Sequence, residues 1–131
     1  MMPKKKVLLV DDSAIMRQAV RPLFDSHPEF VVCGEAEDGR DAIEKAPSLL
    51  PELIVIDMSM PVMNGLEAAP LLIAILPNVS IILLTTHDFS QLLQIARAAG
   101  VHAVVSKSKA VTHLIAQAEA LFGMTPLSRV G

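Results

Sequence analysis

The chain has 131 residues, enough for one domain with a single core. Hydrophobic residues make up 52% of it and aromatic residues only 3%, so the core must consist of aliphatic side chains. A net charge of −3 argues against a nucleic-acid-binding surface, and the single cysteine excludes an internal disulfide and a cysteine-rich metal site.

The first residues do not form a secretion signal, because the apolar run after Lys4–Lys6 is only four residues long and ends at two aspartates. Residues 68–86 carry no formal charge, but Pro70 and Pro77 interrupt them, which argues against a membrane span. We therefore expect a cytoplasmic protein without membrane contact. Lys4–Lys6 are expected to be a solvated N-terminus, and Cys33 a small buried hydrophobic residue.

Short apolar runs alternate with amphipathic segments along the whole chain. The apolar runs predict five strands, at residues 7–10, 30–36, 53–57, 80–85 and 103–106. The amphipathic segments predict five helices, at residues 14–26, 40–50, 66–76, 89–99 and 111–122. Because the strands are continuously apolar, they are typical of parallel strands covered on both faces, which predicts an α/β fold of five βα units.

Pro22 and Pro70 conflict with the helices that are predicted around them. Pro22 predicts a kink or an early end of the first helix, since an interior proline costs about 3 kcal/mol. Pro70 favours a start of the third helix near itself, where a first-turn proline is tolerated. Helical spacing also places Ile15, Leu50 and Ile95 on inward faces.

Three glycines are expected at turns or helix ends. Gly39 and Gly65 are interpreted as turn glycines, and Gly100 as the glycine that ends the fourth helix.

Chemically distinctive side chains follow four of the five strands. Asp11 and Asp12 follow the first, Asp57 ends the third, Thr85 ends the fourth and Lys107 follows the fifth. Right-handed crossovers bring the carboxyl ends of parallel strands to one edge of the sheet. We therefore expect these five side chains to share that edge.

This set of groups suits phosphoryl transfer. Carboxylates about 4 Å apart repel one another by roughly 4 kcal/mol at an effective dielectric constant of about 20, so a cluster of three needs a cation. A site with a small number of oxygen ligands and room for water favours Mg²⁺ over Ca²⁺. Lys107 adds a fixed positive charge, Thr85 a hydroxyl donor, and Asp57 a carboxylate that can accept a phosphoryl group. Each residue alone is also explained as a cap, a turn residue or a solvated side chain; their joint occurrence favours function.

At these residues the sequence resembles the response-regulator receiver domains of bacterial two-component signalling. The resemblance covers about residues 5–122 and rests on the motifs VLLVDDS, EAEDGRDAI, IVIDMSMPVMNGLEA, ILLTTHD, AGVHA and the lysine of VVSK. It implies a flavodoxin-like (βα)5 doubly wound sandwich, whose five-stranded parallel sheet has the order 2-1-3-4-5. The receiver domain would span residues 1–122, and residues 123–131 would form a C-terminal tail with little order.

The resemblance also implies a metal site and a phosphoryl donor. Asp57 would accept the phosphoryl group from a sensor histidine kinase or a histidine phosphotransfer protein. Asp12 would bind Mg²⁺ directly and Asp11 mainly through water, with Asp57 and the main-chain carbonyl of Ser59 completing the protein ligands.

Lys107 and Thr85 would bind the phosphoryl oxygens, and Thr85 would move inward on phosphorylation and change a protein-contact surface. The resemblance thus implies a regulatory phospho-acceptor rather than an enzyme. Such a domain would act on a downstream protein without binding nucleic acid directly, and whether it forms a homodimer stays open.

Several positions depart from the family pattern or adjoin the site. Val104 stands where receivers usually carry an aromatic residue that moves on activation, and Ser108 stands where proline or aspartate usually follows the lysine. The apolar helix at residues 70–76 should expose some apolar side chains, which suggests a contact surface. His87, two residues after Thr85, is either a surface histidine or a group that affects hydrolysis of the phosphoryl bond.

Three alternatives stay open at this point. The chain is either a stand-alone receiver or the excised receiver of a DNA-binding transcriptional regulator. A degenerate receiver that serves only as a binding module is favoured by Val104 and opposed by the complete set of polar residues. An aspartyl-phosphate hydrolase would need a second aspartate where Ser59 stands.

Overall fold

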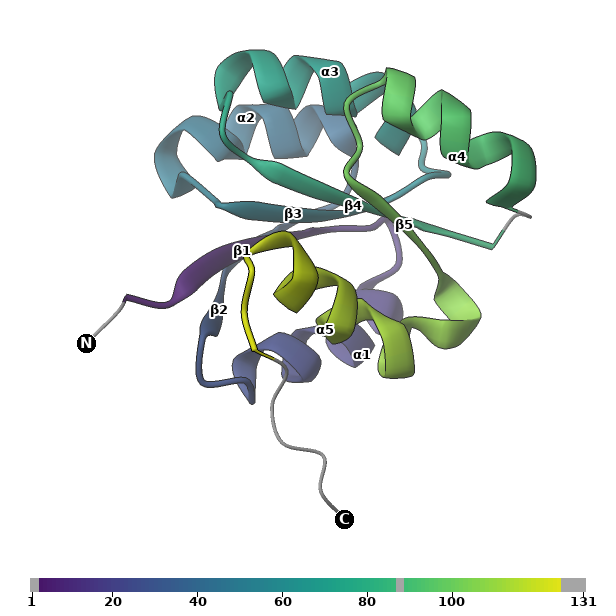
Figure 1. The fold of residues 1–131 in the computed structure, drawn as a ribbon. Coiled ribbons are helices and arrows are strands. Elements are labelled where there is room, and N and C mark those ends of the chain that lie inside the picture. The colour runs from purple at the N-terminus through teal and green to yellow at the C-terminus, as the bar shows by residue number, and fades with distance from the viewer. Residues whose placement is uncertain (1–2, 87–88, 126–131) are drawn as a thin grey trace.

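The computed structural model describes residues 3–86 and 89–125, in which strands and helices alternate along the chain (Figure 1). The elements are β1 (Lys5–Val10), α1 (Ala14–Asp25), β2 (Phe30–Ala36), α2 (Gly39–Leu49), β3 (Leu53–Asp57), α3 (Gly65–Ile75), β4 (Ser80–Thr85), α4 (Phe89–Ala98), β5 (Ala103–Ser106), the 3-10 turn η1 (Lys107–Lys109) and α5 (Ala110–Leu121). The expected strands β2 to β5 have the predicted bounds, and β1 begins two residues earlier than predicted.

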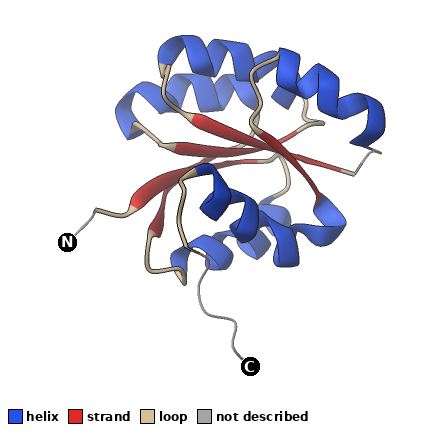
Figure 2. Ribbon diagram, viewed as in Figure 1, coloured by secondary structure: helices blue, strands red, loops and turns tan. Residues whose placement is uncertain are grey.

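All five strands are parallel and lie in the order β2-β1-β3-β4-β5, which confirms the predicted flavodoxin-like fold. Helices α2, α3 and α4 cover one face of the sheet, and α1 and α5 cover the other (Figures 1 and 2). Alternate residues of β1 enter the two cores: Leu8 and Val10 pack on the α2–α4 side, while Val7 and Leu9 pack on the α1/α5 side. This double burial explains why the strands are continuously apolar.

The early end predicted for the first helix and the start near Pro70 predicted for the third are both wrong. Helix α1 continues through Pro22 to Asp25, and α3 begins at Gly65 rather than near Pro70. A helical proline removes the hydrogen bond to the carbonyl four residues earlier. Pro22 and Pro70 are both exposed, so α1 and α3 tolerate them on their solvent sides.

Three side chains that were expected inside are exposed, and Ile15 of α1 is the most exposed of them, at 79%. Leu50 is 55% exposed because it lies just beyond α2 in the left-handed conformation (φ 50°), which turns the chain out of the helix. Ile95 is 56% exposed, while its neighbour Ala96 and Leu92 are the buried residues of α4 that pack on the sheet. Helix α3 exposes Leu71 and Ile75, as expected from its apolar sequence.

Gly39 and Gly65 are not turn glycines, because both lie at the first position of a helix that packs closely on its neighbours. A Cβ atom on Gly65 would lie 2.5 Å from the main-chain oxygen of Asp57, and one on Gly39 would lie 2.8 Å from that of Met63. Gly100 has a φ of 95° after α4, as a helix-ending glycine requires.

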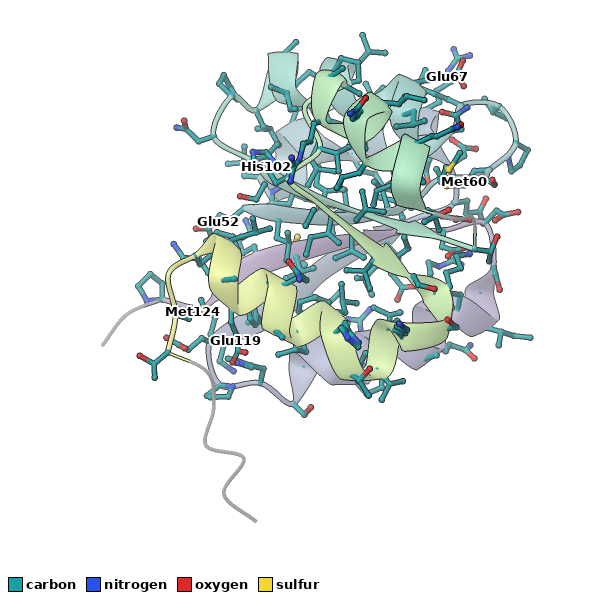
Figure 3. All side chains as sticks on the ribbon, turned by 45° about the vertical axis from the view of Figure 1, so that its right-hand side comes forward. Glu52, Met60, Glu67, His102, Glu119 and Met124 are labelled. Carbon is teal, nitrogen blue, oxygen red and sulfur yellow. The ribbon has the colours of Figure 1, made fainter. Side chains whose placement is uncertain are left out.

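Different segments of the chain lie at the two ends of the parallel strands (Figure 3). Met60 lies at the end where β3 leads into α3, and Glu119 and Met124 lie at the opposite end. Met124 packs on the α1/α5 core and donates its backbone N–H to Glu119, so the chain stays attached to the domain past α5. The rest of the predicted tail, residues 126–131, lies outside the described residues.

Other expectations need small corrections. Cys33 is only partly buried, and burial is the main cause that raises the pKa of its thiol. Lys5 is not simply solvated, because its ammonium group lies 3.2 Å from Glu52 and above the ring of Phe122. None of the helices in the described ranges has the length and apolar character needed to cross a bilayer.

Candidate functional site

The parallel sheet brings the five predicted side chains to one edge. Asp11 follows β1, Asp57 ends β3, Thr85 ends β4, and Lys107 opens η1 directly after β5. Oxygen atoms of Asp11, Asp12 and Asp57 all lie within 4.8 Å of one another.

The ammonium group of Lys107 lies between two carboxylates. Its Nζ is 3.2 Å from Oδ2 of Asp11 and 3.1 Å from Oδ2 of Asp57. Burial alone would lower the pKa of Lys107, but the hydrogen bond to Asp57 and the charge of Asp11 outweigh it and raise that pKa. Lys107 therefore remains a fixed positive charge in the site.

Asp57 is only 4% exposed, and its surroundings disfavour its charge. Burial and repulsion from Asp11 raise its pKa, although Lys107 and the backbone N–H of Ser59, 3.4 Å from Oδ1, act in the opposite direction. A positive charge placed beside this carboxylate would lower its pKa and stabilise the ionised form.

Asp11 is also buried, and its two carboxylate oxygens differ. Oδ1 accepts a hydrogen bond from the backbone N–H of Ser13 at 2.9 Å. Within the described part of the chain, the partner of Oδ2 is the ammonium group of Lys107, at 3.2 Å. Asp12 is exposed to solvent. Three carboxylates this close together, with one of them open to solvent and Lys107 as a single cation between two of them, fit a hard divalent cation.

Thr85 and Ser59 occupy the same edge. Thr85 is buried, and one contact of its hydroxyl group is with the sulfur of Met58 at 3.5 Å. Ser59 is exposed and lines an open hollow in front of the carboxylates, together with Asp12, Met58, Met60, Pro61 and Asn64. His87 lies outside the described residues.

The structure also shows where the two positions that depart from the family pattern lie. Val104 is buried in the core on the α2–α4 side and pairs with Leu83 of β4. Ser108 is exposed in η1, where its hydroxyl oxygen lies 2.9 Å from that of Ser106.

Sequence reasoning missed an arginine pair that adjoins the site. Arg17 of α1 donates hydrogen bonds to the main-chain carbonyl of Asp11 and, at 2.8 Å, to Glu35 of β2. Arg21 also binds Glu35, at 2.6 Å. Burial would raise the pKa of Glu35, but these arginines outweigh it and lower that pKa. The spacing of the arginines was visible in the sequence, but nothing there linked them to Glu35.

Relatives with a known description match part of this chain. It is 51% identical over 65 residues to a protein-glutamate methylesterase/protein-glutamine glutaminase of Pyrococcus horikoshii, a match that spans 50% of this chain and 18% of the relative. The corresponding protein of Thermotoga maritima is 45% identical over 73 residues, or 56% of this chain and 21% of the relative. The chain thus covers about a fifth of the length of these relatives.

Solved structures and a family model match almost the whole chain. The response regulator domain of Thermotoga maritima CheB superimposes with a TM-score of 0.83 at 29% identity, covering 94% of this chain and 99% of that one. A LuxR-family two-component response regulator from Aurantimonas sp. SI85-9A1 gives 0.86 at 28% identity, covering 96% and 91%. The model of the response regulator receiver domain matches residues 7–119. This chain therefore belongs to the response regulator receiver domain family of two-component signalling.

Proposed function

We propose that this domain is a phospho-acceptor switch and that Asp57 receives the phosphoryl group. The observation that carries the proposal is the position of Lys107, whose Nζ lies 3.1 Å from Oδ2 of Asp57 and 3.2 Å from Oδ2 of Asp11. An oxygen of Asp57 would attack the phosphorus of a phosphohistidine. The P–O bond forms as the P–N bond breaks, and the leaving imidazole nitrogen takes up a proton.

A divalent cation, Mg²⁺, is part of the proposal. Asp12, Asp57 and the main-chain carbonyl of Ser59 would hold it directly, and Asp11 through water. When bound, Mg²⁺ neutralises negative charge on the carboxylates and on the transferring phosphoryl group. The spacing of the three carboxylates and the exposure of Asp12 support this assignment.

Lys107 and Thr85 would bind the oxygens of the phosphoryl group. Lys107 supplies a positive charge already at the carboxylate, and Thr85 supplies a hydroxyl from the end of the neighbouring strand. In the unphosphorylated structure this hydroxyl contacts Met58, so moving it toward Asp57 would also release that contact. Val104 carries no ring, so this threonine would transmit the change.

The partners follow from this chemistry. A sensor histidine kinase or histidine phosphotransfer protein would donate the phosphoryl group, and the phosphorylated surface would act on a downstream protein in the cytoplasm. The domain would assist transfer to, and hydrolysis from, its own Asp57 without acting on another substrate. Residues 1–122 would carry this function, with residues 123–131 as a tail.

A second candidate concerns the output. The relatives that are about half identical over half of this chain are methylesterases, which favours a receiver that regulates a methylesterase-type partner or domain over one that regulates DNA binding. Adding the phosphorylated domain to the catalytic part of such a relative should change its rate of ester hydrolysis. An unchanged rate would remove this candidate and leave the phospho-acceptor proposal intact.

The phospho-acceptor proposal is tested by mass spectrometry of the intact protein. Incubation with Mg²⁺ and a small acyl phosphate should add one phosphoryl group to the wild type and none to D57N. The matched control is D38N, because Asp38 caps α2 through its side-chain oxygen and asparagine caps a helix equally well. A wild type that gains no phosphoryl group from the acyl phosphate, or a D57N variant that gains one, would refute the proposal.

A further inference from the structure

Arg17 connects the acidic edge of the sheet to strand β2. One nitrogen of its guanidinium group donates to the main-chain carbonyl of Asp11, and another donates to Glu35 at 2.8 Å. The side chain is only 14% exposed. Glu35 is fixed in turn by Arg21 at 2.6 Å, and its main-chain carbonyl accepts from Lys45 at 2.8 Å. A planar guanidinium group can make both contacts because its donors form a rigid fork.

The carbonyl that Arg17 binds belongs to the peptide group between Asp11 and Asp12. A peptide group is planar, so a hydrogen bond to its carbonyl fixes the orientation of the whole unit and the start of both residues. Asp11 is held further by its own N–H, which donates to Ala36 at 3.1 Å, and by Ser13, which donates to Oδ1. These bonds engage Oδ1 and leave Oδ2 to the ammonium group of Lys107, at 3.2 Å.

Asp12 depends more strongly on this peptide group. Its side chain is exposed, and among residues 3–86 and 89–125 it has no hydrogen bond or ion pair that would orient it. The main chain, which Arg17 holds from the side of α1, therefore fixes the point from which this side chain reaches the cluster.

We propose that Arg17 is a positioning residue for the cation site. It orients the peptide group between Asp11 and Asp12 so that both carboxylates converge on one cation, and Glu35 anchors the guanidinium group while neutralising its charge. This inference rests on the proposed function, because it assumes that the three carboxylates bind a divalent cation.

A purely electrostatic role for Arg17 predicts the opposite change in cation affinity, so the direction of the measured change tests the inference. A guanidinium group repels a nearby cation, so removing its charge should strengthen cation binding if charge alone mattered. Loss of a residue that orients metal ligands instead weakens binding, typically by about 10- to 100-fold. We expect R17Q to bind a divalent cation at least about tenfold more weakly than the wild type.

Arg21 supplies the matched control. It lies one helical turn after Arg17 and binds the same carboxylate of Glu35, but its other partner is Asp25, at 3.1 Å. Within the described residues it makes no contact with Asp11 or Asp12. R21Q removes the same charge from the same ion-pair network, so its cation affinity should equal or slightly exceed that of the wild type.

The probe is Mn²⁺, which takes the same oxygen ligands as Mg²⁺ and whose free concentration is measured by electron paramagnetic resonance. Wild type, R17Q, R17K and R21Q are titrated, and circular dichroism confirms that each is folded. R17K keeps the charge but has no fork for two partners, so it should also bind weakly. If R17Q does not fold, the comparison of R17K with R21Q decides the question.

The outcomes separate this inference from the proposed function. Wild type that binds Mn²⁺, with R17Q and R17K weakened and R21Q unchanged, supports a positioning role. Wild type that binds Mn²⁺ with the same affinity as R17Q and R17K overturns the positioning role alone. Wild type that binds no Mn²⁺ overturns the metal site on which both proposals rest.

Discussion

Asp57 lies in surroundings that disfavour its charge. Its pKa is raised by burial and by repulsion from Asp11, against the opposing effect of Lys107. Between the ordinary carboxyl pKa of about 3.9 and the raised value, the folded protein binds more protons than the unfolded chain. The free energy of unfolding therefore falls as the pH rises through this interval. The site thus holds its phospho-acceptor at some cost in stability.

Replacing Asp57 by asparagine should remove that cost. In the absence of divalent cations, we expect D57N to have a larger free energy of unfolding than the wild type at neutral pH. The difference should disappear below about pH 3.9, where the carboxyl group of the unfolded chain is also protonated. Urea unfolding at several pH values measures it, and a D57N variant less stable than the wild type at neutral pH would contradict this expectation.

Asp41 offers a control of opposite sign. Burial would raise its pKa, but hydrogen bonds from the backbone N–H of Glu37 and from Lys45 outweigh it and lower that pKa. Its contribution to stability is therefore present at neutral pH and is lost as the pH falls through the lowered value. D41N should be less stable than the wild type at neutral pH, unlike D57N.

At the scale of elements, the contact between α3 and β3 determines the geometry of the site. The first residue of α3, Gly65, packs against the main chain of Asp57, and the Asn64 side chain caps the helix in a reciprocal capping box with Glu67. Sequence patterns predicted the strand and the helix but misinterpreted Gly65. Alternation and spacing report on a single element, whereas this glycine is required by the distance between two elements.

Gly65→Ala should therefore affect both the fold and the site. The new methyl group would lie 2.5 Å from the carbonyl oxygen of Asp57, a main-chain atom that cannot rotate away. We expect a loss of about 1–3 kcal/mol in the free energy of unfolding and reduced phosphorylation. In the control Gly34→Ala, the methyl group meets the end of the Leu49 side chain, which can move, so the loss should stay within about 0.5 kcal/mol.

The prolines in α1 and α3 show that tertiary packing can override helix propensity. Helix propensity predicted disruption at Pro22 and Pro70, and both helices run through these residues. Tertiary packing of the buried faces, which include Phe24 in α1 and Leu72 in α3, outweighs the lost hydrogen bonds on the exposed sides. Propensity cannot show this, because the partners of each face come from distant parts of the chain.

At the scale of the whole molecule, the fold and the five edge residues could be predicted because one rule, the parallel sheet, fixes both. The buried pair of His27 and Glu119, at the opposite end of the sheet, could not be predicted. His27 and Glu119 are 92 positions apart, and their atoms Nε2 and Oε2 lie 3.2 Å from each other. The backbone N–H of Glu29 donates a hydrogen bond to Nδ1 of His27. In this tautomer Nε2 carries the ring hydrogen and donates a hydrogen bond to Glu119. No local pattern encodes such a contact.

Loss of this pair should destabilise the whole domain, because it joins the end of α1 to the last helix. His27→Ala removes one partner of the buried Glu119 and the packing of the ring on Phe30, with centroids 4.8 Å apart. We expect a loss of about 2–4 kcal/mol in the free energy of unfolding, measured in urea. The exposed histidine variant His113→Ala should change it by less than about 0.5 kcal/mol, and equal losses in both would contradict the assignment.

The ion pairs of Arg17 and Arg21 with Glu35 also determine which segments of related receivers can be exchanged. A chimera that took residues 11–26 from one receiver and residues 30–36 from another would separate the two arginines from the carboxylate that balances them. Helix α1 and strand β2 therefore form one transferable unit. Work that aims to retarget this receiver by grafting α1 should transplant position 35 together with the helix.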